Sequence, residues 1–219
     1  MRALVLGASG GIGAALTTAL RARGDSVTAL SRQDDGLRIE EAGSLDALLS
    51  GVGEVDLAIV ATGILAPEGA APEKALAQVE AESMARLFAV NAIGPALALA
   101  RIAPLLPKGA RSVVAVLTAR VGSITDNGLG GWHGYRASKA AANMVLRGAS
   151  VELARSHPQA ICVALHPGTV ETPFTRAYAG RHPMIPAEEA ARDLLALIDR
   201  LTPEQSGGFF DRHGAAIPW

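Results

Sequence analysis

Residues 7–13 read Gly7-Ala8-Ser9-Gly10-Gly11-Ile12-Gly13, and this stretch decides how the chain folds. It follows the short apolar run Ala3–Leu6 and leads into a helix-forming stretch, Ile12–Arg23. Glycines at such a turn let the backbone approach a pyrophosphate, and the N–H groups of the following helix point at the same group. A tight turn without a ligand is the alternative, but the strand-to-helix context favours a dinucleotide site. The residues expected to contact the cofactor here are Gly7, Ser9, Gly11, Ile12 and Gly13.

Apolar runs alternate with helical stretches along the rest of the chain. The predicted strands are Ala3–Leu6, Ser26–Ser31, Leu57–Ala61, Ser112–Leu117 and Ile161–Leu165, with a weaker one near Phe209–Phe210. The predicted helices are Ile12–Arg23, Ser44–Ser50, Pro72–Ile93 with its continuation Pro95–Leu106, Gly134–Ser156 and Pro186–Leu201. Almost continuous apolar strands separated by helices indicate an α/β fold. We expect one domain over 1–219, a Rossmann-type doubly wound parallel sheet with helices on both faces. Residues 173–186 are expected to form a substrate loop.

Composition excludes several other classes. A net charge of −1 provides no electrostatic argument for nucleic acid. The single cysteine, Cys162, lies in an apolar run and reads as a buried strand residue. His166 has no second histidine or acid at ligand spacing, so no metal site is expected. Met1 leads directly into a strand, and 92–106 is interrupted by glycine, arginine and prolines, so neither a signal peptide nor a membrane span is expected. The expected compartment is the cytoplasm.

Tyr135 and Lys139 form the most informative polar pair. A spacing of four places both side chains on one face of the predicted helix. An ammonium beside a phenol stabilises the phenolate, which lowers the phenol pKa from its unperturbed ~10 toward working pH. The pair arises often by chance, so its meaning depends on the dinucleotide that the glycine turn predicts.

Five segments in order carry a resemblance to the short-chain dehydrogenase/reductase family, over nearly the whole chain. They are Gly7–Gly13, Ala61-Thr62-Gly63, Asn91, the set Ser123, Tyr135 and Lys139, and His166–Thr172. The second segment keeps only the final glycine of the family's usual Asn-Ala-Gly. Within the family, residues 119–124, 130–139 and the C-terminal ending look like C-factor-like carbonyl reductases.

The resemblance implies a role for each catalytic candidate. Tyr135 would supply a proton and Ser123 a hydrogen bond to the carbonyl oxygen. Lys139 would lower the pKa of Tyr135 and hold ribose hydroxyls, while Asn91 would anchor a water linking Lys139 to solvent. Two plainer readings stay open, since Ser123 can cap a turn and Asn91 can cap or kink a helix. Ser138 is set aside because it points away from the Tyr135–Lys139 face.

The resemblance also implies contacts to ligands. Further cofactor contacts are expected from Ser31, Arg32, Ala61, Thr62, Gly63, Asn91, Tyr135, Lys139, Pro167, Gly168, Val170 and Thr172. Substrate contacts are expected from Ser123, Trp132, Tyr135 and Phe174.

The end of the second strand bears on the choice of cofactor. An acid there holds the ribose 2′-hydroxyl of NAD, whereas NADP needs a cation for its 2′-phosphate. The chain has Ser31-Arg32 at this place, and Arg32 can form a fork with a phosphate. We therefore favour NADP(H) over NAD(H), against the reading of Arg32 as a surface residue. Which acid contacts the adenine, Glu40 or Glu41, stays open.

These observations favour an NAD(P)(H)-dependent oxidoreductase that reduces a small carbonyl compound. One alternative is a dinucleotide-binding regulatory or signalling protein with little turnover. Another is an epimerase or dehydratase on a nucleotide-linked sugar, which usually needs a larger C-terminal region. Pairing of helices in this family implies a homodimer or homotetramer, while the short chain leaves a monomer open as the alternative. The substrate and the reaction direction are not encoded in the sequence.

Overall fold

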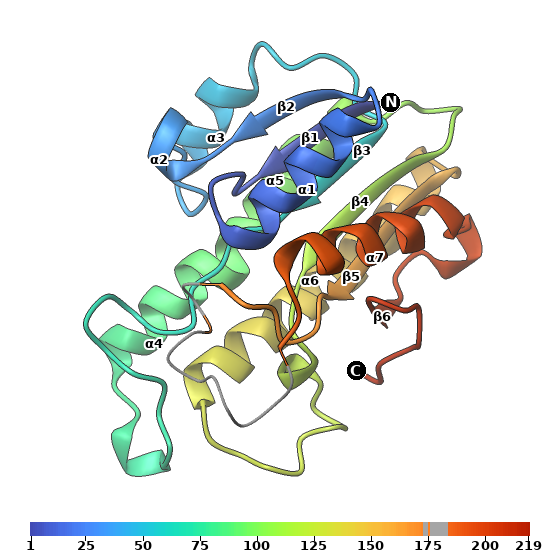
Figure 1. Cartoon of the computed structure of the whole chain (residues 1–219). Helices are drawn as coiled ribbons and strands as arrows, with labels where there is room; N and C mark the ends of the chain where they lie inside the picture. The colour runs from blue at the N-terminus through green and yellow to red at the C-terminus, as the bar shows by residue number, and fades with distance from the viewer. Residues whose placement is uncertain (173–174, 176–183) are drawn as a thin grey trace.

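The computed structural model describes residues 1–172, 175 and 184–219 (Figure 1). Its centre is a six-stranded sheet of order β2-β1-β3-β4-β5-β6, in which every neighbouring pair is parallel. The strands are β1 (Arg2–Leu6), β2 (Ser26–Leu30), β3 (Leu57–Val60), β4 (Ser112–Leu117), β5 (Ala160–His166) and β6 (Phe209–Asp211). The predicted α/β class and doubly wound parallel sheet are confirmed.

Seven α-helices are present in the described part of the chain: α1 (Gly11–Ala22), α2 (Arg32–Asp35), α3 (Ala42–Leu49), α4 (Ala81–Phe88), α5 (Gly94–Ile102), α6 (His133–Ser156) and α7 (Ala187–Arg200). Short 3₁₀ turns cover η1 (Leu76–Gln78), η3 (Ala103–Leu105), η4 (Arg120–Gly122) and η6 (Pro203–Gln205), and η2 (Ala89–Ile93) is a π-helical turn. Most predicted element ends lie within two residues of these bounds. The four-residue α2 was not predicted.

The predicted helix Pro72–Ile93 is wrong in its first half, because the helix begins only at Ala81. The preceding stretch is a loop, and its backbone groups form hydrogen bonds that differ from those of an α-helix. The amide oxygen of Gln78 accepts from Lys74 N at 2.7 Å and from Ala75 N at 3.2 Å. The Glu73 carbonyl accepts from Trp132 N at 2.5 Å. These bonds override the helical pattern in the sequence.

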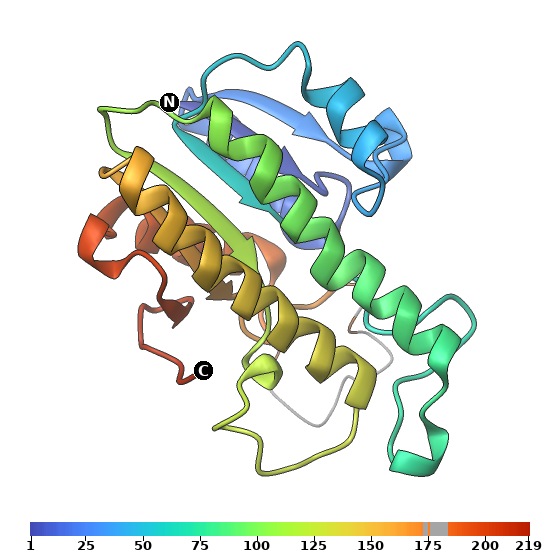
Figure 2. The same ribbon diagram turned by 180° about the vertical axis from the view of Figure 1, so that it is seen from behind.

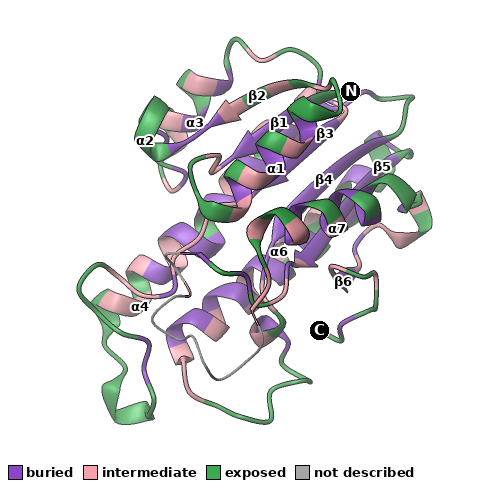
Figure 3. Cartoon of the chain, in the orientation of Figure 1, coloured by how far each residue is buried: buried purple, intermediate pink, exposed green. Residues whose placement is uncertain are grey.

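Alternate residues of each central strand feed two hydrophobic cores. In β1, Leu4 and Leu6 face the core covered by α5 and α6, whereas Ala3 and Val5 face the core covered by α1 and α7. Figures 1 and 2 show these two helix layers from opposite sides, and Figure 3 shows the buried strands between them. Cys162 is fully buried in β5, and burial raises the pKa of its thiol to about 12. The interpretation of Cys162 as a core residue is confirmed.

The helical path from α4 through η2 to η3 is continuous over Ala81–Leu105 and passes Pro95. By length and composition alone it is able to cross a membrane, contrary to the expectation based on its prolines and charges. Half of its most apolar window is buried inside the fold, as in the core helix of a soluble protein.

Candidate active site

The turn between β1 and α1 is packed so tightly that it requires glycine at two places. Gly7 has φ +93°, and a Cβ there would lie 3.0 Å from the Ala61 carbonyl carbon. A Cβ on Gly13 would lie 2.1 Å from the Gly7 oxygen. Gly7 N also donates to Leu30 O at 2.8 Å, which ties the turn to the end of β2. The close packing brings the start of α1 against the carboxyl edge of the sheet, where ligands bind in such folds.

The segment after β5 lies across this turn. A Cβ on Gly11 would be 2.6 Å from Thr172 Cγ2, so Thr172 covers the first residue of α1 directly. Val170 is buried and pairs with Ile185 through an isolated parallel bridge. Gly168 has φ +86°. Of the predicted contact residues in 167–172, Thr172 therefore lies directly against the glycine turn.

An exposed arginine, Arg32, follows the end of β2. Ser31 caps α2: its Oγ accepts from Asp34 N at 2.9 Å and donates to Asp34 Oδ2 at 2.7 Å. Ser31 N donates to Asp35 Oδ2 at 2.8 Å. Both aspartates thus turn toward Ser31, and Arg32 is exposed without an ion pair to any described residue.

The two acids considered for the adenine are both engaged in ion pairs. Glu40 binds Arg86 at 2.6 Å, and Glu41 pairs with Arg38 at 3.5 Å. The structure singles out neither as an adenine contact.

Asn91 is fully buried in the π-helical turn η2. Its Oδ1 accepts from Ile64 N at 2.8 Å, and its Nδ2 donates to Ile64 O at 2.8 Å. The same Nδ2 donates to Ser138 Oγ at 3.1 Å. π-turns of this kind occur frequently at functional sites. From this turn, the Asn91 side chain links the loop after β3 to Ser138 in the second turn of α6.

Lys139 meets Asn91 above Gly63. A Cβ on Gly63 would lie 3.2 Å from Lys139 Nζ and 3.3 Å from Asn91 Oδ1. Lys139 is buried, and its Nζ donates to Leu117 O at the end of β4 at 3.1 Å. The glycine retained from the Ala61-Thr62-Gly63 segment therefore makes room for two of the predicted site residues.

Tyr135 is buried one helical turn before Lys139 on α6. Lys139 Nζ lies 6.0 Å from the centre of its ring. The Trp132 ring packs edge-on against it, with centroids 6.2 Å apart, and Leu65 and Leu87 complete the apolar cluster.

The expected lowering of the Tyr135 pKa by Lys139 is wrong for this structure. Burial instead raises the pKa of the Tyr135 phenol above its ordinary value. Burial also lowers the pKa of the Lys139 ammonium from 10.5 to about 8. The physical reason is that burial removes water from both groups, which disfavours the charged form of each.

Ser123 is buried at the end of η4. Its Oγ accepts from Asp126 N at 3.1 Å, so Ser123 caps a turn, as the plainer reading of the sequence proposed. The preceding Gly122 packs against α6, where a Cβ would lie 2.9 Å from Lys139 Cβ. The structure therefore seats Ser123 beside the helix that carries Tyr135 and Lys139.

Three buried polar atoms at the carboxyl ends of the central strands lack a hydrogen-bond partner among the described residues. They are Thr62 Oγ1 after β3, Thr118 Oγ1 after β4 and His166 Nδ1 at the end of β5. Buried polar groups without partners are costly, which marks this edge as a place for a ligand or water. Burial lowers the pKa of His166 to about 4, so its ring is neutral at neutral pH. Sequence reasoning did not assign Thr118 or His166 to the site, although residues that follow parallel strands are the signal for it.

Of the predicted loop 173–186, residues 173–174 and 176–183 lie outside the described residues, and these include the predicted substrate contact Phe174.

Comparison with known proteins identifies the class. Residues 38–181 match the family model described as short chain dehydrogenase, and the chain belongs to this family. It is 33% identical to the 1-hydroxy-2-glutathionyl-2-methyl-3-butene dehydrogenase of Rhodococcus sp. (strain AD45) over 228 aligned positions, covering 99% of this chain and 98% of the relative. It is 42% identical to the C-signal of Myxococcus xanthus over 146 residues, which cover 66% of this chain and 84% of the relative.

Among solved structures, the chain is similar to a carbonyl reductase from Pseudomonas aeruginosa PAO1 in complex with NADP. The TM-score is 0.81 at 27% identity, with both chains fully covered. The predicted family and its resemblance to carbonyl reductases are confirmed, and the protein is an oxidoreductase of the NAD(P)-dependent kind.

The residues at the sheet edge fit a nicotinamide dinucleotide. Glycines at 7 and 13 allow the turn itself to pack tightly against its own backbone. A pyrophosphate would fit at the start of α1, where the first helical N–H groups have no partner within the helix and no side-chain cap among the described residues. The unpaired hydroxyls of Thr62 and Thr118 lie at the edge where the rest of the molecule would extend.

Proposed function

We propose that this protein reduces small aldehydes or ketones with NADP(H) as hydride source. The observation that carries the proposal is that Lys139 and Asn91 lie together above Gly63, and that Asn91 also bonds to Ser138 on the helix that carries Tyr135. The similarity to a carbonyl reductase with bound NADP supports the same reaction class.

When bound, the nicotinamide cofactor supplies the hydride. The carbonyl oxygen then gains negative charge and needs a proton and a hydrogen bond. Tyr135 donates the proton, because its raised pKa keeps the phenol protonated at neutral pH. Ser123 donates a hydrogen bond to the same oxygen.

Lys139 offsets the charge that proton transfer leaves on Tyr135. With a pKa of about 8, its side chain is mostly an ammonium at neutral pH. Leu117 O and the contact above Gly63 hold this ammonium near the phenol. Asn91 fixes the loop after β3, so that the polar groups around the reacting oxygen stay in place.

The preference for NADP rests on Arg32. Its neighbours Asp34 and Asp35 bind Ser31, which leaves the exposed guanidinium for a 2′-phosphate beyond the end of β2.

The experiment is a panel of aldehydes and ketones with NADPH, comparing the parent with Tyr135→Phe. We expect kcat to fall roughly thousandfold in the variant, because general acid catalysis typically contributes ~10²–10⁴, while NADPH affinity is retained. Turnover that survives the substitution would sink the mechanism.

A second function is favoured by one observation, the 42% identity to a protein named C-signal. In that reading the chain binds a dinucleotide and acts as a signal with little turnover. Tight NADPH binding without reduction of any carbonyl in the panel would support it and exclude the reductase.

The proposal includes a homodimer or homotetramer in the cytoplasm. Ile93, Met144 and Val151 are exposed apolar residues on the π-turn and α6, at 50%, 73% and 47% exposure. A monomeric solution mass at micromolar concentration would count against association.

A further inference from the structure

The turn that enters α6 has an unusual backbone. Gly130, Gly131 and Trp132 have φ of +63°, +67° and +49°, three consecutive left-handed residues. Trp132 is the non-glycine residue with positive φ in the described part of the chain, and such a conformation is strained for a bulky side chain. Trp132 is also the N-cap of α6, where an indole, which only donates, cannot accept a helix N–H. The start of the helix therefore needs an acceptor from another part of the chain.

Glu73 supplies that acceptor from 61 residues upstream. Its carboxylate accepts from Gly134 N at 3.2 Å through Oε1 and at 3.4 Å through Oε2. Its backbone carbonyl accepts from Trp132 N at 2.5 Å. A negative group is favourable at a helix N-terminus. Glu73 thus accepts from two N–H donors, Trp132 N and Gly134 N, one on each side of His133.

The contact is close and leaves little freedom. Glu73 is 7% exposed. A Cβ on Gly134 would lie 2.9 Å from Glu73 Oε1 and 2.7 Å from Leu87 Cδ1, so a larger residue there would displace the ends of these two side chains. Tyr135 is the next residue in the chain, and any shift of this turn moves the phenol.

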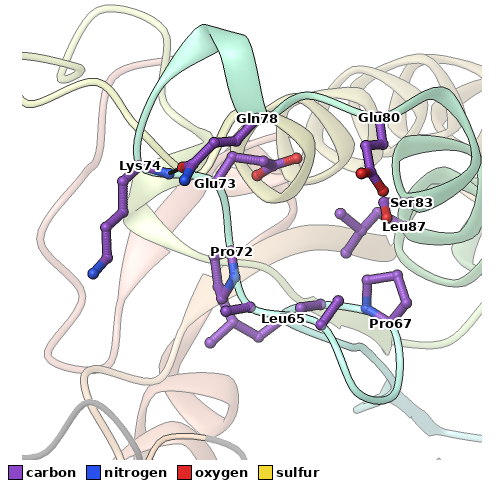
Figure 4. A pocket seen from close by; sticks show the side chains of 12 residues that line it. Leu65, Pro67, Pro72, Glu73, Lys74, Gln78, Glu80, Ser83 and Leu87 are labelled. Atoms are coloured by element: carbon purple, nitrogen blue, oxygen red, sulfur yellow. Dashed lines mark hydrogen bonds between the residues drawn. The ribbon is translucent and has the colours of Figure 1, made fainter.

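Glu73 also lines a pocket of about 360 Å³ formed by the loop after β3 and the start of α4 (Figure 4). Leu65 and Leu87 form part of its wall and belong to the apolar cluster of Tyr135. The carboxylate is therefore placed between this pocket and the helix that carries the phenol.

We propose that Glu73 is a positioning residue, a long-range N-cap that sets where Tyr135 stands relative to the substrate carbonyl. The inference rests on the proposed reductase function. It differs from a purely structural role, in which loss of Glu73 lowers stability but leaves turnover of the folded protein unchanged.

The test compares three substitutions with a matched control. Glu73→Gln keeps the length and an acceptor oxygen but removes the charge. Glu73→Asp keeps the charge but is one methylene shorter, and Glu73→Ala removes both. Glu80→Gln is the control, because Glu80 lines the same pocket without a hydrogen bond to α6 among the described contacts.

Two readouts are needed, kcat per NADPH-binding site and hydrogen exchange of the amides of 132–139. We expect Glu73→Ala and Glu73→Asp to lower kcat roughly tenfold, since small displacements of a catalytic group are costly. Exchange at 132–139 should accelerate in the same two variants, with the NADPH dissociation constant changed by less than about threefold. Glu73→Gln should restore most of kcat, and Glu80→Gln should match the parent in both readouts.

Parental kcat in folded Glu73→Ala and Glu73→Asp would overturn the inference. If Glu73→Ala does not fold, the contrast between the Gln and Asp variants decides alone, and equal kcat in these two overturns it. A parent that reduces no carbonyl in the panel would defeat the proposed function instead. In that case exchange at 132–139 still decides whether Glu73 holds the turn, and parental exchange in Glu73→Ala would refute it.

Discussion

Two glycine-rich turns precede helices in this molecule, and the two helix N-termini differ in whether another residue accepts hydrogen bonds from them. The turn Gly7–Gly13 leads into α1, whose first N–H groups have no side-chain cap in the described part of the chain. The turn Gly130–Gly134 gives two N–H groups at the start of α6 to Glu73. The first arrangement fits a ligand, and the second fixes a helix. We propose that similar local chemistry serves binding in one place and positioning in the other.

The largest effect should come from filling the first turn. Gly13→Ala places a Cβ where the Gly7 oxygen lies only 2.1 Å away, so the turn must open. Overpacking of this kind costs about 1–3 kcal/mol, and we expect NADPH affinity to fall by up to about a hundredfold. Titration of NADPH fluorescence measures it. Gly43→Ala, where a Cβ meets no atom within 4 Å, is the matched control. Parental affinity in Gly13→Ala would show that the turn is not the binding site.

The proposed role of Lys139 on α6 can be tested through the dependence of kcat on pH. Lys139 has a pKa lowered to about 8, so it is charged below that pH and loses its proton as the pH rises through 8. Support for a phenolate on Tyr135 is lost in the same direction. We expect kcat for reduction to fall about tenfold per unit above pH 8. Lys139→Arg, whose cation does not titrate in this range, should give a flat profile with a lower plateau. A parent profile that stays flat to pH 10 contradicts the role of Lys139.

A smaller effect is expected at the far end of the cofactor site. Arg32→Ala should weaken NADPH binding about tenfold, the amount of one charge-assisted hydrogen bond to phosphate. NADH binding should stay within about twofold, because NADH has no 2′-phosphate. Isothermal titration calorimetry measures the affinities for NADPH and NADH, and Arg38→Ala is the control for loss of a nearby exposed cation. Equal weakening of NADPH and NADH would remove the argument for NADP preference.

The smallest effect should arise further along α6. Asn143 is buried one turn after Lys139, and neither side-chain atom has a hydrogen-bond partner within the described ranges. Asn143→Leu should raise the free energy of unfolding by about 1 kcal/mol, because it removes unpaired polar atoms from an apolar site. Urea denaturation measures the change. Destabilisation would mean that the amide has a partner in solution, such as a buried water.

The two turns also differ in how far the sequence alone predicts them. Gly7–Gly13 is contiguous and follows an apolar strand, so its conformation and use follow from seven consecutive residues. The turn before α6 depends on Glu73, which the sequence pattern placed inside a helix beginning at Pro72. Nothing in the local pattern reports a hydrogen bond across 61 residues.

The candidate site shows the same division. The places of Tyr135, Lys139 and Asn91 were predicted from motif and helical spacing, and the structure brings them together. The direction of the Tyr135 pKa was predicted wrongly, because the loss of water on burial depends on tertiary packing by Leu65 and Leu87. The hydroxyls of Thr62 and Thr118, which lack a partner among the described residues, likewise become visible only when neighbouring strands are assembled.

The π-helical turn Ala89–Ile93 works as a spacer of one residue in the packing of the long helix. A residue advances an α-helix by about 100°, but the wider π winding spreads one extra residue over the turn, so α4 and α5 keep nearly the phase of an uninterrupted helix. Deleting a single residue from 89–93 would therefore restore ordinary helical winding with little rotation of α4, and Leu87 would stay beside Gly134. The same deletion would move Asn91 away from Ile64, to which it now bonds. Homologues that are one residue shorter in this helix should therefore carry the deletion within 89–93 and lack the contact between Asn91 and Ile64.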